Sequence, residues 1–462
     1  MVKKIMIKLD KSLTLIIKMF LYIFLMAVFF VVMSYENRPL LILSRTMGST
    51  MLTFSIVGLL FLKIYGTYDI GRRKSKPIIY SLFLATLFTD IITYLELMIM
   101  NTITPDINAF RLNSLEWLLL TVVIQLIIII LFTYGGNALY FYIHDPELCC
   151  VIVSSKDSLK RVLKGINKYK KQYSIKYTLH YKKENLEEYI DKVDTVFICD
   201  VPMLEKEKII NYCYENRKNI YFTPEIADIV EENAENYLLD DISVFNYNVK
   251  SLTLEQRLIK RFIDLFFAVL LGIISSPIWV VSAIAIKSYD HGSILFKQKR
   301  ATLNGKVFEV YKFRTMKENV ENRSVTKDDD RITHPGKVLR KIRMDELPQL
   351  LNIIKGDMSF VGPRPEMMEN VTAYTEELPE FKYRLRVKAG LTGYAQIAGK
   401  YNTTPKDKLM MDLLYIEQYS VWKDIQMMFQ TAIVFLKADS TEAFDTNEDL
   451  KIEGFEEKIE EN

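Results

Sequence analysis

The chain has 462 residues, half of them hydrophobic, and a formal net charge of only +3. This charge balance excludes a protein that binds nucleic acid through bulk positive charge, and we expect no nucleic-acid partner. The four cysteines include no Cys-x-x-Cys pair and the four histidines are scattered, which argues against a zinc site or a disulfide framework. Two of the cysteines lie in apolar runs, where a small buried side chain is the simplest interpretation, and a reducing cytoplasm fits this usage.

Four apolar stretches open the chain, each close to the ~20 residues needed to cross a bilayer core. They are Leu13–Met33, Met47–Tyr65, Ile78–Met100 and Trp117–Phe132. The first stretch is too long for a removed signal peptide and lacks a small-residue cleavage site. Asp90 and Glu96 fall within the third stretch, where they mark either a transport path or a contact between helices.

Basic residues predict the orientation of these stretches. They cluster before the first stretch and in the loop between the second and third: Lys3, Lys4, Lys8, Lys11, Arg72, Arg73, Lys74 and Lys76. The positive-inside rule therefore places both segments in the cytoplasm, together with everything after about Tyr134.

A fifth apolar block, Phe262–Ile286, is long enough to span, but basic residues flank it on both sides. Its centre holds Ser276 and Pro277, and proline kinks a helix by removing a backbone donor and clashing with the preceding turn. Serine hydroxyls can satisfy the freed backbone groups. A re-entrant helix that enters and leaves by one face meets both observations. The alternative, a fifth spanning helix, would put the C-terminal third outside the cell.

Between Leu148 and about Asn248, short β-rich runs alternate with helical patterns, which predicts a parallel, Rossmann-like sheet. The expected strands and helices are Cys149–Val153, Ile175–Tyr181, Thr195–Cys199, Ile220–Phe222, Ser158–Lys168 and Met203–Asn216. The first strand-to-helix turn contains no glycine, so close backbone approach to a pyrophosphate is not prepared. A structural or regulatory role is favoured over nucleotide binding.

A basic cluster begins the C-terminal third. It runs through Arg300 to the pair Asn304 and Gly305, which predicts a tight hairpin turn. In the strand that follows, Lys312 and Arg314 are two residues apart and are expected on one face. Such a cationic face suits a diphosphate or a lipid headgroup, and the alternative is a solvated basic strand.

The acidic pair Asp345 and Glu346 precedes apolar residues at helical spacing, with Pro348 tolerable only in a first turn and Gly356 as a stop. The pair is therefore expected at a helix N-terminus, which stabilises negative charge. Adjacent helical positions diverge by about 100°, so we expect different roles for the two carboxylates. One could attack phosphorus while the other binds a metal or handles a proton. Two ordinary first-turn acids are the alternative.

Prolines on both sides of Arg364 fix its backbone and favour a preset guanidinium for bidentate phosphate contact. The Gly-x-x-Gly turn from Gly390 to Gly393 is weak evidence of a site. The acidic run Asp328–Asp330 resembles a metal site, but its polar surroundings favour a solvated loop.

In this order, three motifs resemble the bacterial sugar transferase family, the monotopic-type polyprenyl phosphate phosphoglycosyl transferases. They are Lys312–Met316, Asp345–Leu350 and Gly356–Pro365, within a similar region from about Leu258 to Leu436. The preceding helices and α/β region look like the large subgroup that begins capsule or exopolysaccharide synthesis. Thr302 and Ala389 depart from the glycine and proline usual in the family, which affects loop stiffness.

The resemblance implies a ping-pong reaction. Asp345 matches the nucleophile that attacks the β-phosphate of a UDP-sugar, and UMP leaves; undecaprenyl phosphate then takes the sugar phosphate. Glu346 matches a partner associated with Mg²⁺ and proton handling, so Asp345 and Glu346 are the expected metal ligands. Arg340 matches a phosphate-positioning residue, while Ser276 and Pro277 match the break in a re-entrant helix. The cations expected to bind substrate phosphates are Lys312, Arg314, Arg340, Arg364 and Arg300.

The predicted architecture has four parts. They are a four-helix transmembrane region (1–140), a Rossmann-like α/β domain (141–250), a mainly α catalytic domain with a re-entrant helix at about 262–286 (251–438), and an acidic tail (439–462), expected to be disordered. The expected setting is the bacterial cytoplasmic membrane, with the catalytic domain on the cytoplasmic side of the lipid bilayer and a homodimer as the assembly.

Two other functions remain open. One is an inactive membrane scaffold, for which the Asp345–Glu346 pair has no evident use. The other is a polytopic transferase without a covalent intermediate, which needs acidic loops between many spanning helices, whereas loop 66–76 offers only Asp69. The identity of the sugar is not predicted.

Overall fold

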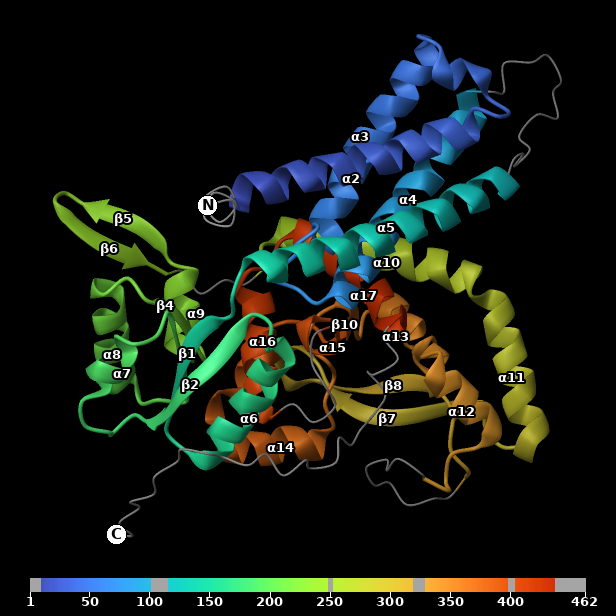
Figure 1. Ribbon diagram of the computed structural model, residues 1–462. Helices are drawn as coiled ribbons and strands as arrows, with labels where there is room; N and C mark the ends of the chain where they lie inside the picture. The colour runs from blue at the N-terminus through green and yellow to red at the C-terminus, as the bar shows by residue number, and fades with distance from the viewer. Residues whose placement is uncertain (1–9, 101–114, 248–251, 319–328, 398–403, 437–462) are drawn as a thin grey trace. The chain divides into compact units, whose positions relative to one another are not determined.

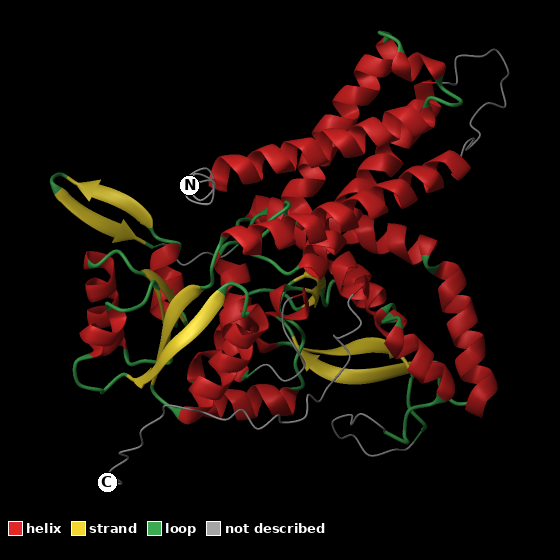
Figure 2. Cartoon of the chain, in the orientation of Figure 1, coloured by secondary structure: helices red, strands yellow, loops and turns green. Residues whose placement is uncertain are grey.

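The computed structural model describes residues 10–100, 115–247, 252–318, 329–397 and 404–436 (Figure 1). The chain divides into two compact units, with the division between Thr223 and Pro224. Helices dominate the N-terminal part of the chain, and strands occur in short sheets further along it (Figure 2). The predicted acidic tail lies outside the described residues.

Within the described ranges, four helices are long and apolar enough to cross a membrane. They are α2 (Asp10–Met33), α3 (Arg45–Tyr65), α4 (Ser75–Met100) and α5 (Leu115–Ile143), with a short 3-10 helix at Arg38–Leu41. Their mean hydropathies of 1.7 to 2.7 explain why the sequence predicts each one. The prediction of four apolar helices is confirmed, although α5 continues past its predicted end at Phe132.

Both acids in α4 contact neighbouring helices. The Gln125 amide of α5 donates to Asp90 Oδ1 at 3.2 Å and to the Leu25 carbonyl of α2 at 3.1 Å. Glu96 accepts a hydrogen bond from Ser49 of α3. Polar side chains that bond across helices are a common means of association inside a membrane. The interhelical interpretation of Asp90 and Glu96 is therefore confirmed.

A four-stranded parallel sheet of order β2-β1-β3-β4 follows. Its elements are β1 (Glu147–Val153), α6 (Lys156–Ile166), a 3-10 turn (Asn167–Tyr169), β2 (Tyr173–His180), α7 (Leu186–Ile190), β3 (Thr195–Cys199), α8 (Met203–Glu215) and β4 (Asn219–Phe222). The last five residues of β1 are all buried, as expected of a strand covered on both faces. All four cysteines are free and buried. The expected sheet-and-helix region is confirmed.

The second unit begins with α9 (Ile226–Glu232) and an antiparallel hairpin, β5 (Glu235–Leu239) and β6 (Ile242–Asn246). Helix α9 packs against α16 (Pro405–Glu417): Ile229 is 2% exposed in the core of this unit, and Lys406 binds Glu225 at 2.8 Å. Residues 224–247 therefore belong to the second unit, with α9 in its core and the β5–β6 hairpin exposed, although we expected the middle domain to continue to about residue 250.

Helices α10 (Leu254–Ile274) and α11 (Ser276–Asp290) meet at a bend of 61°. A capping box of Thr253 and Gln256 starts α10. Pro277 lies in the first turn of α11, where its missing N–H costs no helical hydrogen bond. The Ser275 hydroxyl accepts a 3.1 Å bond from the Trp279 indole. The helix therefore breaks at the residues where the sequence predicts a kink.

The remainder of the second unit packs around a main apolar core and a smaller apolar cluster that contains Ile286, Phe313 and Leu339. In chain order the elements are β7 (Leu295–Ala301), a 3-10 turn (Leu303–Gly305), β8 (Val307–Phe313), α12 (His334–Lys341), a 3-10 helix (Met344–Glu346), α13 (Gln349–Lys355), β9 (Ser359–Val361), α14 (Met368–Glu377), a 3-10 helix (Pro379–Arg386), β10 (Gly390–Thr392), α15 (Tyr394–Ile397), α16 and α17 (Val421–Leu436). Asn304 and Gly305 have φ angles of 57° and 75°, as the predicted hairpin turn requires. Ile353, Met358 and Phe381 are fully buried in the core beside this hairpin.

One loop prediction is wrong. The Asp329 side chain is 1% exposed and forms a buried ion pair with Arg331, whose Nε donates to Asp329 Oδ1 at 2.7 Å. Because the arginine two residues away neutralises the carboxylate, this acid leaves water at a tolerable cost. Asp330 is exposed as expected, and Asp328 lies outside the described residues.

Candidate active site

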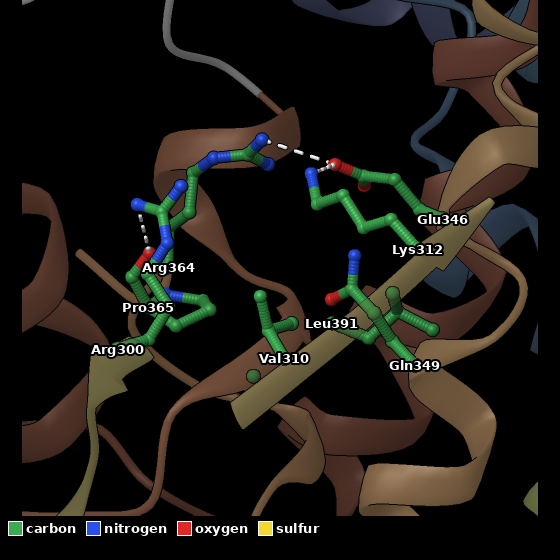
Figure 3. Close-up of a pocket in the computed structure, with 9 residues that line it drawn as sticks. Arg300, Val310, Lys312, Glu346, Gln349, Arg364, Pro365 and Leu391 are labelled. Atoms are coloured by element: carbon green, nitrogen blue, oxygen red, sulfur yellow. Dashed lines mark hydrogen bonds and ion pairs between the residues drawn. The ribbon is translucent and has the colours of Figure 1, made fainter. Parts of the chain in front are cut away.

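A pocket of about 280 Å³, partly open to solvent, lies in the second unit beside β8, the start of α13 and β10 (Figure 3). Its lining consists of Arg300, Val310, Lys312, Glu346, Gln349, Arg364, Pro365, Gly390 and Leu391. Three cations and one carboxylate thus share a wall with short aliphatic side chains. Such a pocket suits a polyanion that also carries uncharged parts.

Glu346 joins two segments of this pocket. Its Oε1 accepts hydrogen bonds from Lys312 Nζ at 2.7 Å and from Arg364 Nη2 at 3.1 Å (Figure 3). Burial disfavours the charged carboxylate, but the charges of Lys312 and Arg364 outweigh burial and hold the pKa of Glu346 below its ordinary value. Glu346 is therefore ionised at neutral pH.

Asp345 precedes Glu346 in the same 3-10 helix but does not line the pocket. Burial, and then the charge of Glu346, raise the pKa of Asp345, although Lys312 and Arg340 act in the opposite direction. In the described part of the chain, no salt bridge occupies its carboxylate. The two neighbouring acids thus have different environments, as the prediction of different roles requires.

An unusual backbone conformation leads into this acidic turn. Arg343 has a φ of 54°, in the left-handed region, and is separated from the end of α12 by Ile342 alone. Burial lowers the pKa of the Arg343 guanidinium and so does the charge of Arg364, whereas the charges of Glu346 and Asp345 act in the opposite direction. Arg343 is thus a cation of the site that sequence reasoning missed, because nothing local distinguishes it from the other basic residues around it.

Arg364 is held by its backbone, while its side chain extends toward Glu346. The Arg364 carbonyl accepts a 2.8 Å hydrogen bond from Arg384, a 2% exposed residue that also binds Asp412 at 2.7 Å. The Arg364 side chain itself is 47% exposed. Pro363 and Pro365 flank it, as the sequence analysis notes. Arg384 was not predicted, since its role depends on a contact 20 residues away.

The other predicted phosphate-binding residues lie in three different environments. Arg300 lines the pocket and donates to the Pro365 carbonyl at 3.3 Å, and burial lowers its pKa. Arg340 donates to Thr315 Oγ1 at 2.8 Å, just after β8. Arg314 lies outside the pocket lining, because its guanidinium binds Asp290 with an N–O distance of 2.6 Å.

The structure thus brings Arg300, Lys312, Glu346 and Arg364 into one pocket with Asp345 beside them. Ser276 and Pro277 do not line it and lie instead at the α10–α11 break. Sequence reasoning missed the lining residues Gln349, Val310 and Leu391. Gln349 belongs to the motif Asp345–Leu350, which was the available signal.

The glycine turn has a packing role. A Cβ built on Gly390 would lie 2.1 Å from the Gly362 nitrogen, so the paired strands β9 and β10 approach closely only with glycine there. This contact brings the Arg364 segment and Leu391 to the same pocket. The weak sequence pattern therefore has a structural reason.

The sequence analysis expects a magnesium ion at the acidic pair. The described residues contain no group of three or more His, Cys, Asp or Glu side chains suited to a metal. Mg²⁺, however, commonly binds through one or two carboxylates together with substrate phosphates. Glu346 Oε1 is engaged by Lys312 and Arg364, which leaves its second oxygen and the Asp345 carboxylate as candidate ligands.

Comparison with known proteins places this pocket in a recognised segment. A family model described as bacterial sugar transferase matches residues 255–438. A UDP-N-acetylgalactosamine-undecaprenyl-phosphate N-acetylgalactosaminephosphotransferase of Aeromonas hydrophila is 39% identical over 37% of this chain and 42% of its own length. A UDP-glucose:undecaprenyl-phosphate glucose-1-phosphate transferase of Caulobacter vibrioides is 37% identical over 39% of this chain and 71% of its own. An uncharacterised sugar transferase of Bacillus subtilis is 39% identical over 38% of this chain and 85% of its own length.

Proposed function

Because this chain belongs to the bacterial sugar transferase family, we propose that it transfers a sugar phosphate from a UDP-sugar to undecaprenyl phosphate and releases UMP. The observation that carries the proposal is the pocket in which Lys312 and Arg364 bind Glu346 directly beside Asp345. The names of two relatives specify different sugars, N-acetylgalactosamine and glucose, so the sugar is left open.

In the first step we propose that a carboxylate oxygen of Asp345 attacks the β-phosphorus of the donor. A phosphorus–oxygen bond forms to Asp345, the bond to the α-phosphate oxygen breaks, and UMP leaves with that electron pair. In the second step a phosphate oxygen of undecaprenyl phosphate attacks the same phosphorus and releases the Asp345 carboxylate. The raised pKa of Asp345 supports this role, since a more basic carboxylate that forms no salt bridge is the better nucleophile.

The pocket cations are proposed to neutralise the diphosphate. Phosphoryl transfer depends mainly on positioning and on stabilisation of charge. Arg300, Lys312 and Arg364 line the pocket and suit this task. Arg340 is proposed to assist from beside Asp345, whereas Arg314 would first have to release Asp290.

Mg²⁺ is proposed as the cofactor, with Asp345 and Glu346 as its protein ligands. When bound, it would neutralise charge on the diphosphate oxygens. Glu346 contributes a second function without the metal, since it holds Lys312 and Arg364 on one side of the pocket.

We further propose that the bent pair α10–α11 is a re-entrant membrane helix, so that the catalytic unit faces the cytoplasm of a bacterial cell. The 61° bend at Ser276 and Pro277 and the basic residues on both sides support this topology. A soluble donor and a lipid acceptor could then reach one interfacial site. The β2-β1-β3-β4 sheet supports a Rossmann-like structural or regulatory domain, and a homodimer and a role in capsule or exopolysaccharide synthesis complete the proposal.

The test is UMP release from a panel of UDP-sugars with undecaprenyl phosphate and Mg²⁺. We expect release with one sugar by the wild-type protein and none by Asp345→Asn. Omission of undecaprenyl phosphate should limit release to about one UMP per enzyme, as a covalent intermediate requires. If folded protein releases UMP from no donor, the scaffold alternative replaces this proposal.

A further inference from the structure

Gln349 is a buried amide that faces the pocket. It is the first residue of α13, is 3% exposed, and lines the pocket beside the residues proposed to bind phosphate. Figure 3 shows its amide directed into the pocket, among Val310, Leu391 and Lys312. Within the described ranges, no residue forms a hydrogen bond with this side chain.

An amide that faces a pocket and has no partner within the fold is available to a ligand. Polar groups inside folded proteins almost always form hydrogen bonds, with the protein itself, with water or with a bound molecule. The neighbouring buried amide of Asn352 illustrates the usual state, since it donates to the Glu309 carbonyl at 2.7 Å and accepts from the Tyr311 amide at 2.9 Å. Gln349 therefore has a hydrogen-bonding capacity that the fold does not use.

We propose that Gln349 binds an uncharged polar group of the sugar nucleotide, next to the diphosphate. This inference rests on the proposed function. The three cations of the lining suit phosphate oxygens, whereas Gln349 is the uncharged polar side chain of the lining and lies among aliphatic residues. An amide offers both a donor and an acceptor. Phosphate oxygens only accept and would leave Gln349 Oε1 unpaired.

Two parts of the donor carry the matching chemistry. A sugar hydroxyl donates and accepts through one oxygen, and the edge of uracil presents an N–H beside a carbonyl. Either group would satisfy both ends of the amide. A pocket built to hydrogen-bond a polar group discriminates strongly against its loss, because its own buried groups are then left unpaired.

The test compares Gln349→Met, which keeps the approximate volume and removes the hydrogen bonds, with the wild-type protein. We expect the KM for the UDP-sugar to rise at least fivefold, with thermal stability unchanged or higher because no bond within the fold is lost. Gln396→Met is the matched control: Gln396 lies outside the pocket lining and donates to the Gly390 carbonyl at 3.4 Å. That variant should keep the wild-type KM.

Inhibition by UDP, which carries uracil but no sugar beyond the diphosphate, shows whether Gln349 binds the uracil or the transferred sugar. If Gln349 binds the uracil, Gln349→Met weakens UDP inhibition as much as it raises KM. If Gln349 binds the sugar, UDP inhibition is unchanged while KM rises. Gln349→Glu keeps the size of the side chain but removes its hydrogen-bond donor, and it should also raise the KM for the UDP-sugar. This variant replaces Gln349→Met in the test if Gln349→Met does not fold.

An unchanged KM and unchanged UDP inhibition in folded, active Gln349→Met would overturn the inference and leave a bound water as the partner. This result differs from failure of the proposed function, in which the wild-type protein itself releases no UMP. In the same assay, the wild-type protein therefore tests the proposed function and Gln349→Met tests the inference about Gln349.

Discussion

The guanidinium of Arg384 donates a 2.8 Å hydrogen bond to the backbone carbonyl of Arg364. Arg384 is at the same time paired with Asp412 of α16, and both side chains are 2% exposed. The pocket residue Arg364 is thus tied through its backbone to the buried core, while its side chain reaches Glu346. This link makes Arg384 a candidate positioning residue for the proposed transfer.

Arg384→Lys should reduce UMP release about tenfold, because a lysine has no planar fork to bind Asp412 and the Arg364 carbonyl together. If Arg384 acts through Arg364, the same change should add little loss in an Arg364→Ala background. Arg386→Lys is the matched control, since Arg386 is 37% exposed and pairs with Glu417. If the double variant loses activity by the product of the two single losses in UMP release, Arg384 does not act through Arg364 and the positioning role is contradicted.

Arg364→Ala should fold normally and lower kcat/KM at least tenfold, because it removes a charge-assisted contact to phosphate. The fold should tolerate the change since the side chain is 47% exposed. Lys297→Ala is a suitable comparison: Lys297 is 56% exposed and pairs with Glu309 outside the pocket. Near-normal turnover of Arg364→Ala would remove this residue from the site.

Asp345→Asn should abolish UMP release and also raise the melting temperature at neutral pH. The raised pKa of Asp345 means that its charged form is disfavoured in the folded protein. Its contribution to stability is therefore full below the pKa of the unfolded chain and is lost as pH rises through the folded pKa. A neutral amide avoids this loss. The gain should vanish at acidic pH, and a variant less stable than wild type at pH 7 would contradict the argument.

Asp290 should stabilise the fold through Arg314 in the opposite pH range. A hydrogen bond from Arg314 lowers the pKa of Asp290 to about 2, against the effect of burial. This stabilisation is present above the ordinary aspartate pKa of about 4 and is lost as pH falls toward 2. Asp290→Asn should thus lower the melting temperature at pH 5 to 7, with a difference from wild type that shrinks below pH 4. A constant difference across this range would exclude the ion pair as its cause.

The re-entrant topology predicts that the two ends of α10–α11 face one side of the membrane. Cysteines introduced at the exposed positions Glu255 and Lys306 should both react with an impermeant thiol reagent only from the cytoplasm. Leu43→Cys, 97% exposed between α2 and α3, should react from the outside. The four native cysteines are buried and give little background. Labelling of Glu255→Cys and Lys306→Cys from opposite sides would establish a spanning helix instead.

Local chemistry was sufficient to predict most elements from the sequence. The lengths of the apolar runs predicted α2 to α5, Pro277 predicted the break before α11, and Asn304 with Gly305 predicted the turn between β7 and β8. Each of these features depends on residues within one or two turns of chain. The motif around Asp345 and Glu346 could be recognised for the same reason, since its residues are contiguous.

Contacts between distant segments decided the rest. Lys312 and Arg314 are two residues apart, yet one binds Glu346 and the other binds Asp290, a divergence that spacing along a strand does not reveal. Asp329 is buried because an arginine neutralises it, and Arg384 matters because its segment folds back onto Arg364. Burial and the choice of partner depend on which segments meet, and both follow from packing of the whole unit. Local sequence therefore predicted the elements and the acidic motif, whereas packing determined which cations, and which buried amide, surround the pocket.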